Sequence, residues 1–223
     1  MIYCSDREAI DSIIETGRQL YSQGLTVGTD GNISCLVSDN ALWTTATGAR
    51  KGFLTQDWLV KTDLQGKILE GSRAPSSELK MHLCLYRHNP RARAAVHTHP
   101  PFSTTFAAAH LSFDDMLLAE EGLYLGHVQV APYATPGTDA LAESIIPFCR
   151  ENNAVLLANH GAVTWGKTLS EACARMETLE RSARIRYYCL TMGKACYLTP
   201  EEAAVLHQKG VKLGNFEGSP SSF

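Results

Sequence analysis

The sequence has little excess of either charge sign and no long apolar run. Its 20 lysines and arginines nearly balance its 23 aspartates and glutamates, the formal net charge is −3, and the pI is near 6.2. Without a basic block, no surface for nucleic acid or for an anionic membrane is expected. The apolar stretches are far shorter than the roughly 20 residues that span a bilayer. Nucleic acid and membrane are therefore not expected partners, and any anion site must be local.

The sequence also lacks paired cysteines and a targeting segment. Its seven cysteines are scattered and include no C-x-x-C pair, which is typical of free thiols in a reducing compartment. We expect them to be buried packing residues. Asp6, Glu8 and Asp11 stand where a signal peptide would be basic and then apolar. The sequence therefore predicts a cytoplasmic protein.

Length and composition predict one soluble domain. The chain has 223 residues, of which 44% are hydrophobic and 19% charged, enough to bury a single core. No internal repeat at a period of 20 to 50 residues is visible, which argues against a solenoid. We expect one domain over residues 1–209, followed by a flexible glycine- and serine-rich tail at 210–223.

Helical and extended patterns alternate along the chain. Ser5 and Glu8 form a capping box ahead of a helical apolar repeat, and Pro147 is expected to kink or split a helix. This alternation predicts an α/β layered sandwich with a central mixed, largely antiparallel sheet flanked by helices. The expected strands include 33–37, 41–45, 128–131, 154–158 and 162–165, and the expected helices include 76–88, 100–109, 138–152, 169–187 and a short one after Thr199.

Three histidines and a glutamate form a candidate metal site. His97 and His99 follow an apolar strand at positions i and i+2, so their side chains leave the same face. His160 follows the apolar run 154–158, which reads as a buried strand, and Glu78 lies at the opening of a predicted helix. Three imidazoles and a carboxylate suit zinc, and also manganese or cobalt. Any one of these histidines taken alone would more often be an ordinary hydrogen-bonded residue.

Six ordered motifs carry a family resemblance. They are Gly31-Asn32-Ile33-Ser34, Thr47-Gly48, Pro75-Ser76-Ser77-Glu78, His97-Thr98-His99-Pro100, the segment 131–138 and Asn159-His160-Gly161. In their order and spacing the chain resembles the class II aldolase/adducin family, and within it the bacterial sugar phosphate aldolases of the L-fuculose 1-phosphate type. The resemblance covers about residues 5–207. It implies a layered fold assembled as a homotetramer, with active sites between neighbouring subunits.

Small and hydroxyl residues form a candidate phosphate site. Such residues bind phosphate through backbone N–H and hydroxyl groups, although each one alone also fits a turn or a helix cap. In the aldolases that the chain resembles, the matching positions bind the substrate phosphate. These positions are Gly31, Asn32, Thr47, Gly48, Ser76 and Ser77. Lys51 and Arg50 lie beside them and could add positive charge, although Arg50 is better explained as a solvated loop residue.

The resemblance implies zinc-dependent aldol cleavage. A ketose 1-phosphate, either L-fuculose 1-phosphate or a deoxy or methylthio pentulose 1-phosphate, would give dihydroxyacetone phosphate and an aldehyde, with Glu78 as the catalytic base. The family's acid looks to be a tyrosine, which is not matched at 113–116 or in the tail. Glu120, Glu121, Tyr124 and Tyr133 are possible replacements, and the apolar tail residues Phe216 and Phe223 would suit a deoxy or methylthio sugar end.

Other activities fit the same metal site. A ribulose-phosphate 4-epimerase would re-add the aldehyde without releasing it, and a dehydratase or decarboxylase would act on a sugar-acid phosphate. An adducin-like interaction module would need neither the metal site nor the phosphate site. The complete set of Glu78, His97, His99 and His160 therefore argues against that last alternative.

Overall fold

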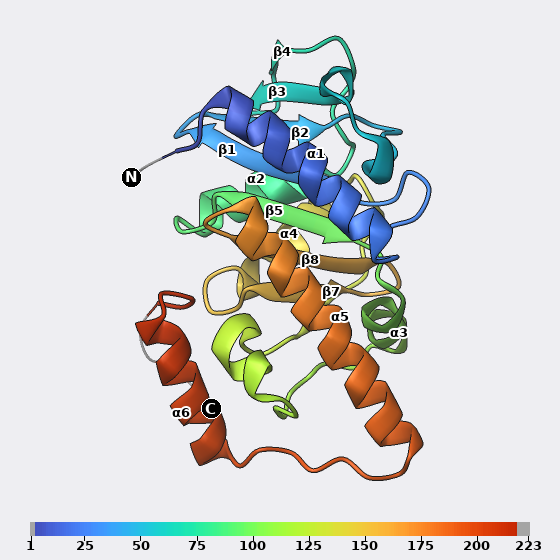
Figure 1. Ribbon diagram of the computed structural model, residues 1–223, viewed down its shortest axis with the longest axis vertical. Helices are drawn as coiled ribbons and strands as arrows, with labels where there is room; N and C mark the ends of the chain where they lie inside the picture. Colours follow the sequence, from blue (N-terminus) through green and yellow to red (C-terminus); the bar gives the residue numbers. More distant parts are fainter. Residues whose placement is uncertain (1–2, 218–223) are drawn as a thin grey trace.

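A computed structural model describes residues 3–217, which form one eight-stranded sheet between layers of helices. The strand order is β4-β3-β2-β1-β5-β8-β7-β6, and all neighbours are antiparallel except the parallel pair β6 and β7. The predicted fold class is confirmed (Figure 1). The strands are β1 (Asn32–Ser38), β2 (Ala41–Thr45), β3 (Leu59–Asp63), β4 (Ile68–Glu70), β5 (Ala94–Thr98), β6 (Val130–Ala131), β7 (Ala154–Leu157) and β8 (Gly161–Gly166).

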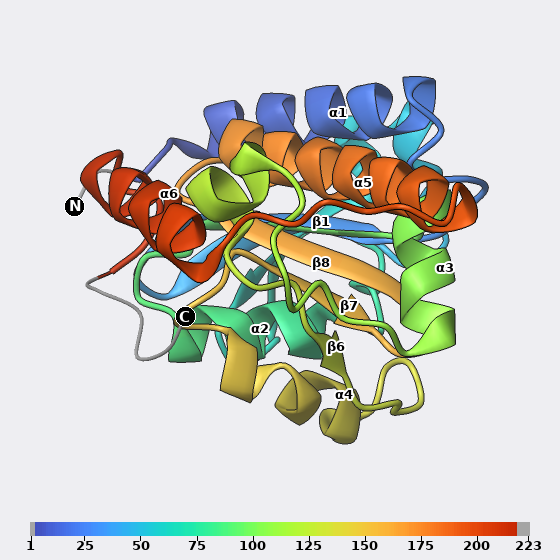
Figure 2. The same ribbon diagram turned by 90° about the horizontal axis from the view of Figure 1, so that it is seen from below.

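Helices cover both faces of this sheet. Figure 2 shows α1 and α5 on one face and α2 and α4 on the other. Each face has its own cluster of buried apolar side chains. The helices are α1 (Asp6–Ser22), α2 (Leu79–His88), α3 (Pro101–Ala109), α4 (Asp139–Ser144), α5 (Leu169–Thr191) and α6 (Pro200–Lys212), with shorter turns at Lys51–Phe53, Gln56–Trp58, Glu121–Leu125 and Ile146–Phe148.

Strand β5 lies at the centre of the sheet and is buried along its whole length. Ala94 and Val96 pack into the cluster beneath α1 and α5, whereas Ala95 packs into the cluster beneath α2 and α4. Because side chains alternate along a strand, His97 leaves the same face as Ala95. The alternation therefore directs His97 toward α2.

Several predicted boundaries differ from the structure. The capping box of Ser5 and Glu8 is present, and the helix expected at 138–152 is divided before Pro147, as predicted. The helix expected from Ser76 begins only at Leu79, because Pro75 forms a bridge with Ala46 and the Ser76 N–H donates to Thr45 O instead.

The predicted start of the tail is also different. Gly210 lies inside α6 and is buried. A Cβ at Gly210 would lie 2.7 Å from the Phe216 ring and 2.8 Å from the carbonyl oxygen of Leu123, so close packing requires a glycine here. Residues 218–223 of the expected tail, including Phe223, lie outside the described residues. The division into a domain and a tail stays a prediction.

The predicted burial of the cysteines is right for four of them. All seven are free thiols; Cys35, Cys84, Cys149 and Cys173 are buried, whereas Cys196 is exposed. No helix within residues 3–217 has the length and apolar character needed to cross a membrane.

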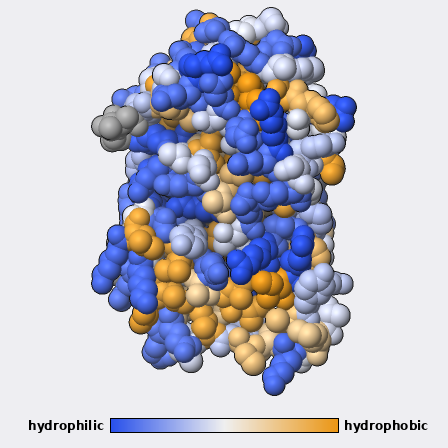
Figure 3. Space-filling model, viewed as in Figure 1, coloured by the Kyte–Doolittle hydropathy of each residue, from blue (hydrophilic) through white to orange (hydrophobic). Residues whose placement is uncertain are grey.

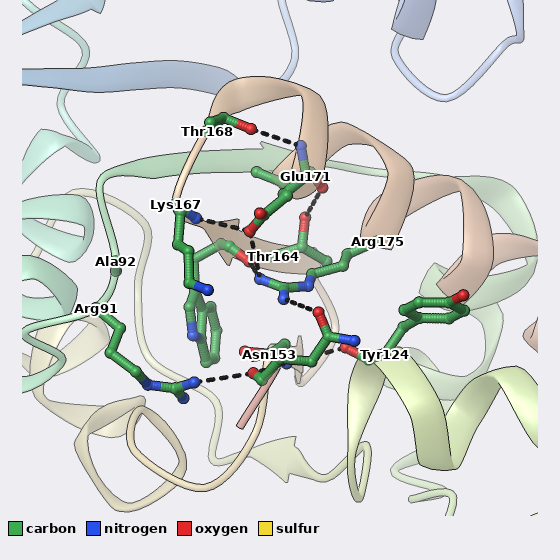
Figure 4. Close-up of polar contacts among 12 residues, drawn as sticks. Arg91, Ala92, Tyr124, Asn153, Thr164, Lys167, Thr168, Glu171 and Arg175 are labelled. Atoms are coloured by element: carbon green, nitrogen blue, oxygen red, sulfur yellow. Dashed lines mark hydrogen bonds and ion pairs between the residues drawn. The ribbon is translucent and has the colours of Figure 1, made fainter. Parts of the chain in front are cut away.

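Asn215 attaches the end of α6 to the body of the protein. Its backbone carbonyl accepts hydrogen bonds from Arg91 Nη1 and Asn153 Nδ2, both at 2.9 Å. Its side-chain oxygen accepts from Arg175 Nη2 at 3.2 Å, and its Nδ2 donates to Leu123 O at 2.8 Å. Figure 4 shows the side chains of Arg91, from the loop before β5, and Arg175, from α5, pointing into the same cluster of polar contacts. These bonds hold the segment after α6 in place.

Replacing Asn215 with alanine is expected to destabilise the protein by about 1–3 kcal/mol, because both side-chain hydrogen bonds are lost and their partners stay part-buried. Urea unfolding measures this change. Asn40→Ala, at the exposed tip of the β1–β2 hairpin, is the control and should change stability by less than about 0.5 kcal/mol. Equal effects of the two substitutions would contradict the role of Asn215 in holding the segment after α6 in place.

Candidate active site

Strands β1 and β5 direct polar side chains toward the start of α2. Asn32 pairs directly with His97 across the antiparallel strands, so the two side chains leave the same face. Glu78 lies immediately before α2 on that face, and Asn32 Nδ2 donates to Glu78 Oε2 at 3.0 Å. The strand register therefore brings His97, Asn32 and Glu78 together.

The three predicted histidines and Glu78 meet at one point. The Nε2 atoms of His97 and His99 are 3.2 Å apart. Glu78 Oε2 lies 3.3 Å from His97 Nε2, and Glu78 Oε1 lies 3.2 Å from His160 Nε2. One ligand atom from each histidine lies within 4.8 Å of those of the other two. His99 itself lies one residue beyond the end of β5.

Backbone contacts fix the orientation of His97. Its Nδ1–H donates to Ala162 O at 2.8 Å, which turns Nε2 toward Glu78. Asp30 Oδ2 lies 3.6 Å from His99 Nδ1, on the side of that ring away from His97. In metal sites, a carboxylate or carbonyl oxygen next to the ring nitrogen that does not face the metal orients the imidazole.

The protonation states also fit a metal. Burial alone would raise the pKa of Glu78, but the hydrogen bond and charge of His97, and then the charges of His160 and His99, lower it to about 2. Burial lowers the pKa of His99 and of His160 to about 4, helped by the charge of His97. At neutral pH the site thus offers a carboxylate and neutral imidazoles from His99 and His160. The buried Glu78 Oε1 has no hydrogen-bond partner in the described part of the chain, so this donor set fits a divalent ion.

His160 lies in a tight turn between β7 and β8. The preceding Asn159 has φ 54°, a left-handed conformation that asparagine tolerates better than most residues. The side-chain oxygen of Asn159 lies 2.7 Å from His110 Nε2, and its backbone N–H donates to Ala107 O at 3.2 Å. The turn that presents His160 is therefore held by the end of α3.

The start of α3 is held by a carboxylate that the sequence analysis missed. Glu180 of α5 is buried and accepts hydrogen bonds from the backbone N–H groups of Phe102 and Ser103, at 2.9 and 2.8 Å, and from the Ser103 hydroxyl. A carboxylate at a helix N-terminus satisfies donors that the helix leaves unpaired. Glu180 thereby positions the segment directly after His99. An acidic residue within the apolar stripe of the long helix was its only sequence signal.

The loops of the predicted phosphate site are joined to one another. Thr47 N–H donates to Ala74 O at 3.0 Å, and Ser76 N–H donates to Thr45 O at 3.2 Å. Gly48 has φ 74° with open space where a side chain would lie. The N–H groups of Gly48 and Ser77 donate to no acceptor among residues 3–217. These loops therefore keep two backbone donors that the described fold does not use.

Gly31 lies close to the backbone of His97, one of the candidate metal ligands. It has φ 76°, and a Cβ there would lie only 2.3 Å from His97 O. Any other residue would push β1 away from β5. The candidate phosphate loops and the candidate ligands are thus parts of one site. We call the six residues of the candidate phosphate site the cradle: Gly31, Asn32, Thr47, Gly48, Ser76 and Ser77.

Two of the candidate acids, Glu121 and Tyr133, make no contact with the candidate ligands within the described chain. Glu121 is buried, and its Oε2 lies 3.2 Å from Arg186 Nη2. Tyr133 is 59% exposed, and no tyrosine hydroxyl within residues 3–217 is hydrogen-bonded to the four candidate ligands. Phe216 is only 5% exposed because it stacks on His207. The acid stays unassigned.

His82 is a second residue that the sequence analysis missed. It lies one helical turn after Glu78 and is fully buried, with Nδ1 2.7 Å from Ser34 Oγ, which also lies 2.7 Å from the Tyr86 hydroxyl. Burial, followed by the charge of His97, lowers the pKa of His82 to about 3. The spacing of Glu78, His82 and Tyr86 by four residues on one helix face could have indicated it.

We expect the metal-free protein to become less stable as the pH is lowered, partly because of His82. The folded protein keeps this ring neutral down to about pH 3, whereas the unfolded chain binds a proton near pH 6.5. Stability is therefore lost as the pH falls below 6.5, by about 2 kcal/mol between pH 7 and pH 5 from this one group. Urea unfolding of wild type and His82→Gln measures the difference. Parallel pH profiles would show that His82 is not neutral in the fold.

Comparison with known proteins gives consistent matches. Residues 11–187 match the family described as Class II Aldolase and Adducin N-terminal domain. The chain is 34% identical over 202 residues to the 3-oxo-tetronate 4-phosphate decarboxylase of Haemophilus influenzae, covering 89% of this chain and 95% of that one. It is 35% identical over 202 residues to the 5-deoxy-D-ribulose 1-phosphate aldolase of Bacillus thuringiensis, covering 89% and 93%. A solved L-fuculose 1-phosphate aldolase superposes with a TM-score of 0.87 at 29% identity, covering 93% and 97%.

Proposed function

The chain belongs to the class II aldolase and adducin family, and from this premise we propose that it is a metal-dependent aldolase that cleaves a ketose 1-phosphate into dihydroxyacetone phosphate and an aldehyde. One observation supports this proposal above the others. A carboxylate and three imidazoles converge next to loops with free N–H donors. This combination suits a substrate that carries a phosphate beside a polarisable ketone.

Glu78, His97, His99 and His160 would hold the divalent ion, which is zinc in this proposal, with manganese or cobalt as alternatives. When bound, the ion supplies a Lewis acid that stabilises the negative oxygen of an enediolate. The cradle would bind the phosphate through backbone N–H groups and the hydroxyls of Thr47, Ser76 and Ser77.

Glu78 would move a proton to and from a carbon atom of the substrate. In condensation it removes a proton from the carbon of dihydroxyacetone phosphate that forms the new bond, and in cleavage it returns that proton. A carboxylate with a low pKa is a weak base, so contact with the substrate and exclusion of water must compensate. Asn32 holds Glu78 Oε2 in place through its Nδ2–H. Glu78 therefore combines two roles, metal ligand and base.

Decarboxylation is the second candidate function. Loss of carbon dioxide from a phosphorylated 3-oxo acid gives the same enediolate. Unlike aldol cleavage, it does not require a base that deprotonates a substrate hydroxyl group. Relatives named as 3-oxo-tetronate 4-phosphate decarboxylases support this candidate. Glu78, the histidines and the cradle would have the same tasks in both reactions.

One assay separates the candidates. Zinc-loaded protein is incubated with the 1-phosphates of fuculose, rhamnulose, 5-deoxyribulose and methylthioribulose, and with a 3-oxo-tetronate 4-phosphate. Dihydroxyacetone phosphate released with an equal amount of aldehyde supports the aldolase, whereas release with carbon dioxide supports the decarboxylase. Epimer formed without free aldehyde would favour an epimerase, and a metal-loaded protein with no turnover would overturn the proposal.

We further propose that the protein is a cytoplasmic homotetramer with active sites between neighbouring subunits. Apolar and aromatic side chains are exposed toward the end of α5, among them Tyr187, Tyr188, Leu190 and Met192. Figure 3 shows apolar surface gathered on the lower half of the face along which α5 runs (Figure 1). Such a surface is typical of a subunit contact.

A further inference from the structure

Lys51 is a buried cation beside the cradle. It opens the helical turn Lys51–Phe53 and is only 2% exposed. Its Nζ donates to the carbonyl oxygens of Thr29 and Ala49, both at 2.7 Å. No carboxylate within residues 3–217 lies within ion-pair distance of it. A buried ammonium without a paired carboxylate is costly, so its retention calls for an explanation.

The two carbonyl groups belong to different cradle loops. Thr29 lies two residues before Gly31, and Ala49 directly follows Gly48. One ammonium group therefore joins the loop of Gly31 and Asn32 to the loop of Thr47 and Gly48. The hydrogen bonds of Thr47 and Ser76 join the second loop to the third. Lys51 is the cross-link that completes the cradle.

Lys51 also lies within electrostatic range of the candidate metal ligands without touching them. Burial lowers the pKa of its ammonium to about 8, while the charges of Asp30 and Glu78 raise it. In turn, the charge of Lys51 acts on His99. The six cradle residues are uncharged. The neighbouring Arg50 is exposed, with its guanidinium over the Phe53 ring at 4.7 Å.

We propose that Lys51 is the positioning residue of the cradle: it holds two loops in register and supplies the fixed positive charge by which the site selects a phosphate group. This inference rests on the proposed function. A neutral cradle of N–H and hydroxyl donors accepts many polar groups, whereas an added buried cation favours an anion. In a site of low polarity this attraction is screened less than at the surface.

The test compares Lys51→Met with Arg50→Met, which removes the same charge from the adjacent exposed position. Inorganic phosphate is titrated into the zinc-loaded proteins by calorimetry, and the zinc content of each is measured. We expect Lys51→Met to bind phosphate at least about tenfold more weakly, and Arg50→Met to stay within about twofold of wild type. Zinc content should be the same in all three proteins. If Lys51→Met does not fold, Lys51→Gln replaces it with the same expectation, because its amide offers two uncharged donors.

Three results would overturn the inference. Unchanged phosphate affinity in the Lys51 variant would show that the residue does not act on the anion. Equal losses in both variants would show a general charge effect. Loss of zinc together with phosphate would show that Lys51 merely maintains the fold.

Kinetics separates this inference from the proposed function. On any substrate that wild type cleaves, Lys51→Met should raise KM at least about tenfold with kcat within about threefold, since uniform binding is lost. An unchanged KM would reject the role of Lys51 and leave the reaction intact. If wild type cleaves no substrate yet binds phosphate in a Lys51-dependent way, the proposed reaction is wrong and the role of Lys51 stands.

Discussion

Replacing His97 with alanine is expected to remove bound metal and activity together. The His97 ring is fully buried, and its Nε2 lies between His99 Nε2 and Glu78 Oε2. Alanine leaves a gap in the donor set, and the remaining groups cannot close it because they are held by three other segments: Glu78 at the start of α2, His99 after β5 and His160 in the β7–β8 turn. We expect metal affinity and kcat/KM to fall by more than about a hundredfold. Metal analysis of the purified variant and steady-state kinetics measure the two losses.

The control is His88→Ala. His88 lies at the end of α2, with Nδ1 2.9 Å from Cys84 O. This variant should keep its metal and its activity. A His97→Ala protein that retained one metal ion per chain would exclude His97 as a ligand.

The Glu78→Gln variant is expected to lose turnover while the cradle keeps its affinity for phosphate. The amide has the shape of the carboxylate, and its oxygen can still accept from Asn32 Nδ2, but it cannot take a proton from carbon. We expect kcat to fall by about 10²–10⁴, with the affinity for inorganic phosphate within about threefold of wild type. Kinetics and calorimetry at saturating zinc measure these quantities, because the variant also loses a charged ligand.

Glu70→Gln changes an exposed carboxylate of β4 and should leave kcat unchanged. Full activity in Glu78→Gln would remove Glu78 as the base. A joint loss of turnover and phosphate affinity would mean that the substitution disturbs the cradle through Asn32.

The sequence predicted the family, the fold class and the grouping of the candidate ligands. Both the family and the fold class are confirmed. The i and i+2 spacing of His97 and His99 was informative because a strand places such residues on one face. The structure brings these two residues together with His160 and Glu78. Their roles as ligands, and the role of the cradle, stay predictions.

What the sequence could not show depends on contacts between distant segments. Glu180 and His82 read as ordinary helix residues, and only the packing of α5 on α3 and of α2 on β1 reveals their partners. Lys51 reads as a loop residue, because no local pattern predicts that two backbone carbonyls will enclose its ammonium. Gly210 reads as the start of a tail because glycine usually ends helices. Here it continues α6, since Phe216 packs against it.

The strand order has a consequence for how the protein acquires its metal. Strand β5 is hydrogen-bonded to β1 on one side and to β8 on the other. Its partners are about 65 residues away along the chain, as in the pairs Asn32 with His97 and His97 with Val163. Such non-local pairs form only after large loops have closed. Before that moment the chain offers an incoming ion seven free thiols and eight imidazoles. Because metal held by the unfolded chain subtracts from the stabilisation of the native state, zinc should raise the unfolding midpoint by less than its affinity for the folded site alone would give.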